Sequence, residues 1–542
     1  MQKWHLDQIR PERLLGLLTG GMALVNLISA VTPALKERLV LLEEIVPLQV
    51  RAGTRLATAL AGFALILLAA GIWRGKRTAW MITLAVLAVS SVGHLIKGFD
   101  FEEASLAAIL LIGLVVFRGR FKARSDAPTI ERGLRTLGLA LAFTLVYGTA
   151  GFYLLDKHFA IHFSLWQAAG QTLRMFTEFS DPGLIATTRF GRYFAFSVYL
   201  IGAATGGFAL LALLAPVLLR RQPERSERER AAEIVRQHGR TVLARFCLFE
   251  DKHFFFSPGG SVIAYAYSNR TAVVLGDPIG PREDALAAVK AFQDFCFRND
   301  WQAAFYQTLP DYLEAYRSAG FKALKIGEEA LVDLQSFTLK GSEMKPIRNS
   351  VSKLERLGYR CQLSQPPHDA VLLDRLQQIS DEWLEGRKEM KYSLGWFERG
   401  YLNTTPILSV QDAQGQVVAF ANLVDEYQNR ELAVDLMRHQ HELPAGTMDY
   451  LFASLLQTAQ QMGYQRFNLV LSGLAGVGET SSDPAIEQAL HYFYTHANTA
   501  YNFRGLHSFK EKFAPDWSPR YLIYPNLPSL PMVAVALNDL GS

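Results

Sequence analysis

The stretch ELAVDLMRH at residues 431–439 contains an acidic and a basic side chain three positions apart, Asp435 and Arg438. A carboxylate can orient or deprotonate a hydroxyl, and a guanidinium can hold a phosphate or a developing oxyanion. In a regular strand, residues three apart point to opposite faces of the sheet. Joint action therefore requires a bulge or a strand end between the two residues. The alternative interpretation of the pair is a structural salt bridge.

The C-terminal part of the chain alternates cations with aromatic rings. The run NFRGLHSFKEKF at 502–513 contains Arg504, Lys510 and Lys512, and Arg520 follows beyond two prolines. Cations interleaved with rings suit a phosphate-rich ligand with stackable bases, such as the single-stranded end of an RNA. A solvated basic helix explains the same pattern equally well.

A second basic run lies upstream, in a segment at 341–360 that is expected to be a connector helix. It contains Lys345, Arg348, Lys353 and Arg356. Such a face could contact the backbone of an RNA. It could also be the exposed side of a linker helix, and the sequence leaves both interpretations open.

Two loops stand where a phosphate could bind, directly before a helical pattern. They are GDPIGP at 276–281 and QHELPAG at 440–446, which ends in Gly446 before a helix that starts at Thr447. A loop that binds acyl-coenzyme A usually has several glycines, because successive backbone amides must grip the pyrophosphate. One loop has a single glycine and the other has the wrong spacing, so no coenzyme is expected. The amides near Gly446 and Thr447 could serve another phosphate.

The elements that carry these residues form an internal repeat in the second half of the chain. The first copy has strands at 261–267 and 271–275, a helix at 283–298 and a strand at 302–307. The second copy has strands at 406–411, 416–427 and 430–439, a helix at 447–462 and a strand at 467–471. This order is that of an acyltransferase fold. The sequence therefore predicts an α+β part of two tandem acyltransferase-like (GNAT-type) units.

The first part of the chain has a different character. Half of the 542 residues are hydrophobic and a fifth are charged, with a net charge of only +4, so the two classes must be segregated along the chain. About six apolar runs predict an α-helical membrane bundle, at 14–33, 54–73, 79–96, 104–117, 134–155 and 193–219. Lysine and arginine in alternate loops predict that both ends of the bundle face the cytoplasm. Small residues in the last run suit packing within one bundle or in a homo-oligomer.

These patterns divide the chain into five segments. They are a transmembrane helical domain at 1–220, a charged linker or interfacial helix at 221–245, a first acyltransferase-like unit at 246–340, a basic connector helix at 341–360, and a second acyltransferase-like unit at 361–542. The last segment holds the candidate site and the basic C-terminal stretch. The three cysteines are far apart and form no CxxC pair, so we expect no metal site.

Ten segments between residues 95 and 522 resemble those of a known family. They are LIKGFDFEEA, VVLGDPIGP, AFYQ, IGEEALVDL, DEWLEGRKEMKYSLGWF, VVAFANL, AVDLMRH, GTMDYLF, GYQRFNL and FYTHANTAYNFRGLHSFKEKFAPDWSPRYL. In these segments the chain resembles the aminoacyl-phosphatidylglycerol synthases, also called the multiple peptide resistance factor family, which includes phosphatidylglycerol lysyltransferases. The match covers most of the chain.

The resemblance implies transfer of an amino acid from aminoacyl-tRNA to a hydroxyl of phosphatidylglycerol in the bilayer. The product lowers the negative charge of the membrane, which is linked to antimicrobial peptide resistance. Aminoacyl-tRNA is already an activated ester, so no ATP, metal or coenzyme is needed. The implied location is a bacterial cytoplasmic (inner) membrane, with a multi-pass anchor and a soluble domain in the cytoplasm. With about six spans, a lipid flippase activity is not implied.

The resemblance also implies roles for single residues. It places Asp435 and Arg438 at the centre of the site, with Lys510 and Lys512 in its basic C-terminal wall. Asp435 would assist the attacking hydroxyl, while Arg438 and Lys510 would bind phosphate and oxyanion. Arg504, Lys512 and Arg520 would hold the lipid phosphate or the tRNA end.

The sequence leaves two alternative functions open. One is transfer from aminoacyl-tRNA to a different lipid or to a cell-wall acceptor, and the other is a lipid transporter or sensor without catalysis. The stretch NLVLSGLAGVGE at 468–479 departs from the family pattern, which reads close to NLGMAPLSG. We expect this loop to border the substrate site, so the resemblance leaves lysine and alanine both open as the transferred residue.

Overall fold

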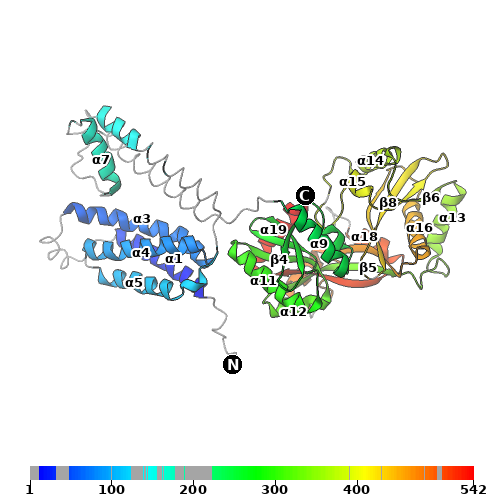
Figure 1. Cartoon of the computed structure of the whole chain (residues 1–542), viewed down its shortest axis with the longest axis horizontal. Helices are drawn as coiled ribbons and strands as arrows, with labels where there is room; N and C mark the ends of the chain where they lie inside the picture. The colour runs from blue at the N-terminus through cyan, green and yellow to red at the C-terminus, as the bar shows by residue number, and fades with distance from the viewer. Residues whose placement is uncertain are drawn as a thin grey trace, which may run out of the picture. The chain divides into compact units, whose positions relative to one another are not determined.

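The structure is a computed structural model that describes most of the chain. The described residues are 11–31, 48–98, 100–123, 138, 142, 145–154, 162, 164–177, 188, 222–389, 391–428, 430–480, 483–496 and 503–541. They form two compact units. A helical region comprises Met1–Leu219 with Phe297–Trp301, and a sheet region comprises Arg220–Cys296 and Gln302–Ser542. Each region is described by itself (Figure 1).

The helical region contains four long apolar helices among its described residues. Its described elements are α1 (Pro11–Val31), α3 (Leu48–Trp73), α4 (Arg77–Gly98), α5 (Phe101–Val116), the 3-10 turn η2 (Arg118–Arg120) and α7 (Leu165–Thr177). Helix α1 packs against α3 and α5, and α4 packs against both α3 and α5. Leucines such as Leu65 and Leu110 fill the space between them. Large apolar side chains also point outward, among them Phe63, which is 61% exposed, and Ile109, which is 65% exposed.

The predicted membrane bundle is only partly described. Within the described residues, one helical segment, Arg77–Leu95, is long and apolar enough to cross a membrane, and the apolar segments Ala61–Trp73 and Leu145–Leu154 are shorter. The predicted run at 193–219, with its small residues, lies outside the described residues, as does much of the run at 134–155. Six spans and homo-oligomer packing therefore stay predictions.

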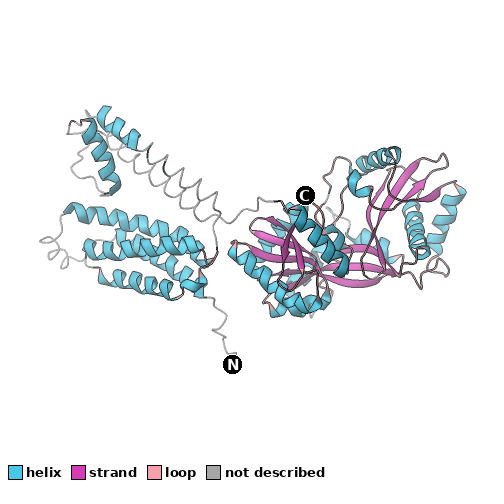
Figure 2. Ribbon diagram, in the orientation of Figure 1, coloured by secondary structure: helices cyan, strands magenta, loops and turns pink. Residues whose placement is uncertain are grey.

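A single mixed sheet of eleven strands organises the sheet region (Figure 2). The strands are β1 (His253–Phe256), β2 (Val262–Ser268), β3 (Thr271–Leu275), β4 (Gln302–Thr308), β5 (Lys322–Asp333), β6 (Arg360–Ser364), β7 (Ile407–Gln411), β8 (Val417–Asp425), β9 (Glu431–His439), β10 (Arg466–Gly473) and β11 (Asp516–Tyr524). Their order across the sheet is β1-β2-β3-β4-β11-β5-β10-β9-β8-β7-β6. Strands β3 and β4 are parallel, as are β9 and β10, whereas the other neighbours are antiparallel.

The repeat predicted from the sequence is present in this sheet. Strands β2, β3 and β4 with their helix form the first copy, and β7 to β10 with theirs form the second. The two copies are joined into one sheet by the antiparallel pair β5 and β10. Strand β11 belongs to the second unit in sequence, yet it pairs with β4 and β5 of the first. The C-terminal strand therefore completes the sheet of the first unit.

Helices cover both faces of the sheet. They are α9 (Arg225–His238), α10 (Leu243–Phe246), α11 (Ala285–Arg298), α12 (Leu313–Ser318), α13 (Lys345–Arg356), α14 (Ala370–Leu384), α15 (Arg399–Leu402), α16 (Thr447–Gln461), α17 (Ala485–His496), α18 (Phe503–Glu511) and α19 (Leu530–Gly541), with short 3-10 turns η4 (Arg282–Asp284), η5 (Pro310–Tyr312) and η6 (Leu527–Ser529). The arginines of the predicted interfacial segment lie largely on α9. Arg225 there pairs with Glu229 and Arg236 with Glu233, which weakens the attraction of this helix for an anionic surface.

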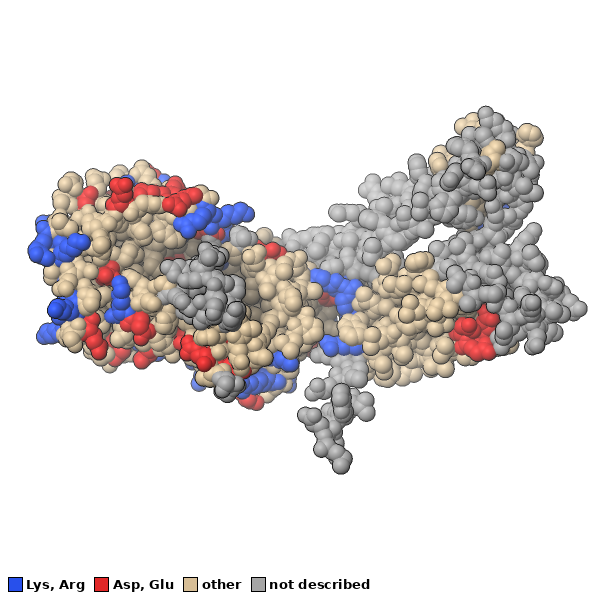
Figure 3. Space-filling view, turned by 180° about the vertical axis from the view of Figure 1, so that it is seen from behind, with Lys and Arg blue, Asp and Glu red and all other residues tan. Residues whose placement is uncertain are grey.

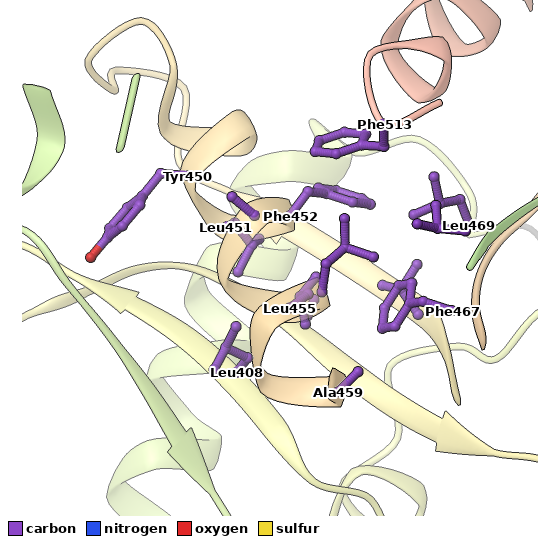
Figure 4. Packing of buried hydrophobic residues seen from close by; sticks show 14 of the residues in the cluster. Leu408, Tyr450, Leu451, Phe452, Leu455, Ala459, Phe467, Leu469 and Phe513 are labelled. Carbon is purple, nitrogen blue, oxygen red and sulfur yellow. The ribbon is translucent and has the colours of Figure 1, made fainter. Parts of the chain in front are cut away.

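The main core lies between α16 and the strands of the second unit. Phe452 of α16 packs against Phe513, with ring centroids 5.8 Å apart, and the same cluster contains Phe467 and Leu469 of β10 (Figure 4). Burial of such side chains contributes roughly 1.5–3 kcal/mol each. A smaller core on the opposite face joins α14 and α15 to β7, β8 and β9. These two layers fix β9, the strand that carries the candidate site.

Candidate active site

A bulge in β9 brings the two candidate residues together. Opposite Asn422 of β8 the register shifts, and β9 gains one residue relative to its neighbour. Asn422 Oδ1 accepts a hydrogen bond of 2.8 Å from the Leu436 N–H, an amide that the bulge removes from the regular ladder. In a regular strand these two residues would point to opposite faces, but the extra residue of the bulge shifts the alternation by one position. Asp435 and Arg438 therefore both lie on the face covered by α14 and α15.

Asp435 is held by two neutral donors. Its Oδ2 accepts a hydrogen bond of 2.6 Å from the Tyr401 hydroxyl, and its Oδ1 accepts one of 2.9 Å from the Gly395 N–H. A Cβ atom at position 395 would overlap the carboxylate, so glycine is required there. Burial raises the pKa of Asp435, while these two hydrogen bonds and the charge of Arg438 act in the opposite direction.

Arg438 is buried against an acid and an indole ring. Its Nη2 donates to Glu389 Oε1 at 2.5 Å, and its guanidinium lies 4.1 Å from the centroid of the Trp383 ring. Burial lowers the pKa of Arg438, and the charge of Glu389 counteracts this effect. Its Nε is buried and has no hydrogen-bond partner among the described residues. A buried donor without a partner suits an oxygen of a ligand.

Beside Asp435, strands β9 and β10 stop pairing. Their parallel register runs only as far as Asn468 opposite Ala433. Beyond that point β10 bulges against β5, and Val470 adopts a φ of 59°, which is unusual for a β-branched residue. Asp435 is two residues beyond the last pair on β9, and Val470 is two residues beyond it on β10. Both therefore lie where the two strands have separated.

Lys510 of α18 binds the bulged part of β10. It was expected in a basic wall, but the residue is only 1% exposed. Its Nζ donates to the carbonyl oxygens of Val470 and Leu471, at 2.9 and 3.0 Å, which the bulge leaves available. Because burial removes the ammonium from water, it lowers the pKa of Lys510 to about 7.

The turn before α16 is closed by its own hydrogen bonds. Gly446 is the N-cap with a φ of 97°, and a side chain there would press on Ser350 of α13. The amide and hydroxyl of Thr447 both donate to the Pro444 carbonyl, at 3.1 and 2.7 Å. Both groups are therefore used within the turn rather than directed to a ligand.

Among the side chains that the structure describes, the predicted substrate-binding cations do not gather at one point. Lys512 is partly exposed and forms an ion pair of 2.8 Å with Asp449 in the first turn of α16. Arg520 is buried in the sheet, where it pairs with Glu329 of β5 and donates to Ser518 Oγ. Arg504 is a residue of α18, and its side chain lies outside the described residues.

The basic residues of α13 divide into two groups. Lys345 and Arg356 are exposed, as is Lys353, which donates to the Ala445 carbonyl at 3.1 Å. Arg348 instead closes the preceding turn by donating to the Leu339 and Gly341 carbonyls. On the face of the sheet region seen in Figure 3, lysine and arginine side chains gather at the end where α13 and β6 lie.

Sequence reasoning missed the partners of the central pair. Tyr401, Gly395 and Glu389 come from a segment 34 to 46 residues upstream of Asp435, and no local pattern links them to β9. The stretch DEWLEGRKEMKYSLGWF contains Trp383, Glu389 and Gly395, but its composition alone assigns them no role. The available signal for this contact was Gly395, a glycine inside a run rich in aromatic and charged residues.

Comparisons with known proteins show which family the chain belongs to. A family model described as phosphatidylglycerol lysyltransferase, C-terminal, matches residues 232–524. A phosphatidylglycerol lysyltransferase of Bacillus subtilis (strain 168) is 30% identical over 476 residues, which is 85% of this chain and 52% of that protein. One of Staphylococcus epidermidis (strain ATCC 12228 / FDA PCI 1200) is 34% identical over 54% of this chain and 35% of that protein.

A solved structure resembles the sheet region. L-PGS from Bacillus licheniformis is 32% identical, with a TM-score of 0.53, over 60% of this chain and 98% of that one. The chain spans about half the length, or less, of the curated relatives that it matches. The family model nevertheless covers more than half of the residues, and the chain therefore belongs to the phosphatidylglycerol lysyltransferase family.

Proposed function

We propose that this protein transfers an aminoacyl group from aminoacyl-tRNA to a hydroxyl of phosphatidylglycerol. The observation that carries the proposal is the bulge in β9, which directs Asp435 and Arg438 to one face where β9 and β10 separate. Such a transfer uses a carboxylate, a guanidinium and a lysine of lowered pKa, and the Arg438 Nε has no partner within the described part of the chain.

The reaction requires one bond to form and one to break. The lipid hydroxyl oxygen attacks the ester carbonyl carbon of aminoacyl-tRNA, and the bond from that carbon to the ribose oxygen then breaks. The hydroxyl proton moves to a base and returns to the leaving ribose oxygen. The energy of the ester drives the exchange, so the chain has to align the reactants, move this proton and stabilise the oxyanion.

Lys510 is the proton acceptor in this proposal. A lysine with an ordinary pKa near 10.4 is protonated at neutral pH and cannot accept a proton. With a pKa of about 7, Lys510 is partly neutral there, which matches a general base to its working pH. Its two backbone acceptors at Val470 and Leu471 hold the amine in place between cycles. This role replaces the phosphate contact that the resemblance implied.

Asp435 orients the substrate, and Arg438 stabilises the developing oxyanion. Tyr401 and the Gly395 amide each occupy one lone pair of the Asp435 carboxylate, which leaves capacity to accept a bond from the hydroxyl or from the ammonium of the aminoacyl group. Arg438 is tied to Glu389 through Nη2, so its orientation is fixed, and Nε–H is the group that donates to the developing oxyanion.

The outer contacts belong to the remaining cations. Lys512 and Arg504 bind the phosphates nearest the ester, and Lys345, Lys353 and Arg356 of α13 bind the tRNA backbone. Arg520 serves the sheet instead, since its guanidinium is engaged by Glu329.

The helical region anchors the enzyme in a bacterial cytoplasmic membrane. Outward-facing side chains such as Phe63 and Ile109 suit a lipid environment. The sheet region then works in the cytoplasm, where aminoacyl-tRNA is found. Lysine is the proposed aminoacyl group, because the curated relatives are named for lysyl transfer, and alanine is the second candidate.

Product analysis tests this function. Purified full-length chain is incubated in phosphatidylglycerol micelles with tRNA charged separately with each labelled amino acid. We expect label in the lipid phase from lysyl-tRNA. Label from alanyl-tRNA alone would change the donor, and label that appears only with another lipid or a cell-wall amine would change the acceptor. No transfer from any donor, beside an active known synthase, would contradict the proposal.

A further inference from the structure

One loop of the second unit supplies a fixed partner to Asp435 and another to Arg438. Residues 385–398 carry the Gly395 amide, which donates to Asp435, and Glu389, which accepts from Arg438. Glu389 also accepts a bond of 3.0 Å from the Phe397 N–H, which ties the two ends of the loop together. A displacement of this loop would therefore move the partners of both candidate residues at once.

The loop is anchored to the first unit by Tyr392. The Tyr392 hydroxyl donates to the Val273 carbonyl of β3 at 2.7 Å, and its side chain is almost completely buried. The ammonium of Lys252, also from the first unit, lies 4.5 Å from the centroid of the Tyr392 ring. Burial lowers the pKa of Lys252, and the neighbouring Asp251, 2.5 Å away, counteracts this effect.

The backbone of the anchor is in an unfavourable conformation. Tyr392 has a φ of 74°, in the left-handed region that aromatic residues rarely adopt. Such a conformation persists only where the surrounding contacts impose it. The contacts of the Tyr392 side chain include β3 and Lys252, which both belong to the first unit.

A second contact from the same unit reaches the site directly. The ring of Phe249 packs edge-on against Trp396 of the loop and against Tyr401, with both pairs of centroids 5.1 Å apart. Tyr401 is the residue that donates to Asp435. Phe249 therefore supports both the loop and the second donor to the carboxylate.

From these contacts we infer that Tyr392 is a positioning residue, through which the first acyltransferase-like unit holds loop 385–398 against Asp435 and Arg438. The first unit then contributes to the reaction without touching the substrate. This inference rests on the proposed function for its effect on turnover, but not for its effect on the loop.

The matched substitutions are Tyr392→Phe and Tyr316→Phe, each in the full-length chain. Tyr392→Phe keeps the ring under Lys252 and removes the bond to Val273. Tyr316 is an equally buried tyrosine of the first unit, whose hydroxyl donates to Asp277 Oδ1 at 2.9 Å and whose ring packs against Phe305 within that unit. Each substitution removes one buried hydrogen bond, but only the bond of Tyr392 holds the loop.

Two measurements are made on each variant. Hydrogen exchange of peptides covering 387–398 reports on the loop, and steady-state transfer to phosphatidylglycerol reports on turnover. For Tyr392→Phe we expect faster exchange in these peptides and a kcat lowered about tenfold, the equivalent of one net hydrogen bond. The KM for aminoacyl-tRNA should stay near that of the wild type, because the exposed basic residues are untouched. Tyr316→Phe should change neither loop exchange nor kcat.

The outcomes separate this inference from the proposed function. Unchanged exchange in Tyr392→Phe would overturn the anchoring, and faster exchange with an unchanged kcat would overturn the role of Tyr392 as a positioning residue. An equal loss of kcat in Tyr316→Phe would reduce Tyr392 to a general structural role. If the wild type transfers nothing to lipid, the proposed function fails, and the exchange comparison alone then decides whether Tyr392 holds the loop.

Discussion

At the scale of single residues, Asp435 is a buried carboxylate whose charge remains able to interact with a substrate. A carboxylate in a dry site normally pairs with a cation or takes up a proton. Here its nearest donors, Tyr401 and Gly395, are neutral, and the guanidinium of Arg438 is turned to Glu389. The negative charge is therefore stabilised only in part, which leaves it able to interact with a substrate.

Replacement of Asp435 by Asn tests the importance of this charge. The amide keeps the size of the side chain and one acceptor for the Gly395 N–H, so the fold should be retained. Transfer to lipid should fall by about 10²-fold or more, as for other groups that assist proton movement or orientation. Single-turnover assays with labelled aminoacyl-tRNA measure this, with circular dichroism as the control of folding. Full activity of Asp435→Asn would exclude the proposed role.

The lowered pKa of Lys510 predicts that both activity and stability depend on pH. Only its neutral form accepts a proton, so kcat should rise as the pH increases through about 7. For stability, the folded pKa lies below that of the unfolded chain, so the unfolded state binds more protons between about 7 and 10.5. The unfolding free energy should therefore increase with pH across that interval.

The comparison variant is Lys510→Met, which is similar in length and carries no charge. Its activity should be low at every pH, and the difference in unfolding free energy between wild type and variant should shift in favour of the wild type as the pH rises. Thermal unfolding over a pH series measures this difference. A difference that does not change with pH would show that Lys510 keeps an ordinary pKa.

At the scale of elements, short apolar runs bounded by turns were sufficient to predict several strands but not the site. Such runs predicted β2, β3, β7, β8 and β9, most of whose residues are buried. The need for a bulge between Asp435 and Arg438 also followed from the sequence alone. The partner loop could not be predicted, because the Tyr392–Val273 bond joins residues 119 apart and has no local pattern. The burial of Lys510 depends on a bulge in β10 that the sequence does not indicate.

At the same scale, we predict that helix α13 contributes to the binding of tRNA. Its exposed residues Lys345 and Arg356 should bind the tRNA backbone without reading its sequence. Changing both to Gln should weaken binding of aminoacyl-tRNA and lower the slope of log K against log salt by roughly 0.7 to 0.9 for each phosphate that the variant no longer neutralises. Filter binding over a salt series measures the slope. Lys290→Gln on α11, an exposed lysine of the first unit, is the matched control. Equal slopes for all variants would remove α13 from the tRNA site.

At the scale of the whole sheet region, the two units are not independent domains. The chain leaves the second unit after α18 and returns as β11 between β4 and β5. Helix α19 then packs on β2 and β3. This return explains why a sequence-based boundary at 361 cannot separate the units, because segment lengths alone do not reveal that a C-terminal strand pairs far upstream. It also gives the first unit a fixed place from which Phe249 and Val273 can hold the site.

Variants of the ion pair between Arg520 and Glu329 test how much the return of β11 to the sheet contributes to the stability of the fold. Both side chains are buried where β11 meets β5, and burial lowers the pKa of Arg520 to about 10, so the guanidinium remains charged at neutral pH. Arg520→Met should lower the unfolding free energy by about 3–5 kcal/mol, because it leaves Glu329 as a buried charge without its partner. The double variant Arg520→Met with Glu329→Leu should recover most of this loss, since the charge to be desolvated is gone. Denaturant unfolding of the wild type, the single variants Arg520→Met and Glu329→Leu, and the double variant gives the coupling free energy. If Arg520 bound the substrate instead, the single variant would keep its stability and lose only activity, and the second substitution would restore nothing.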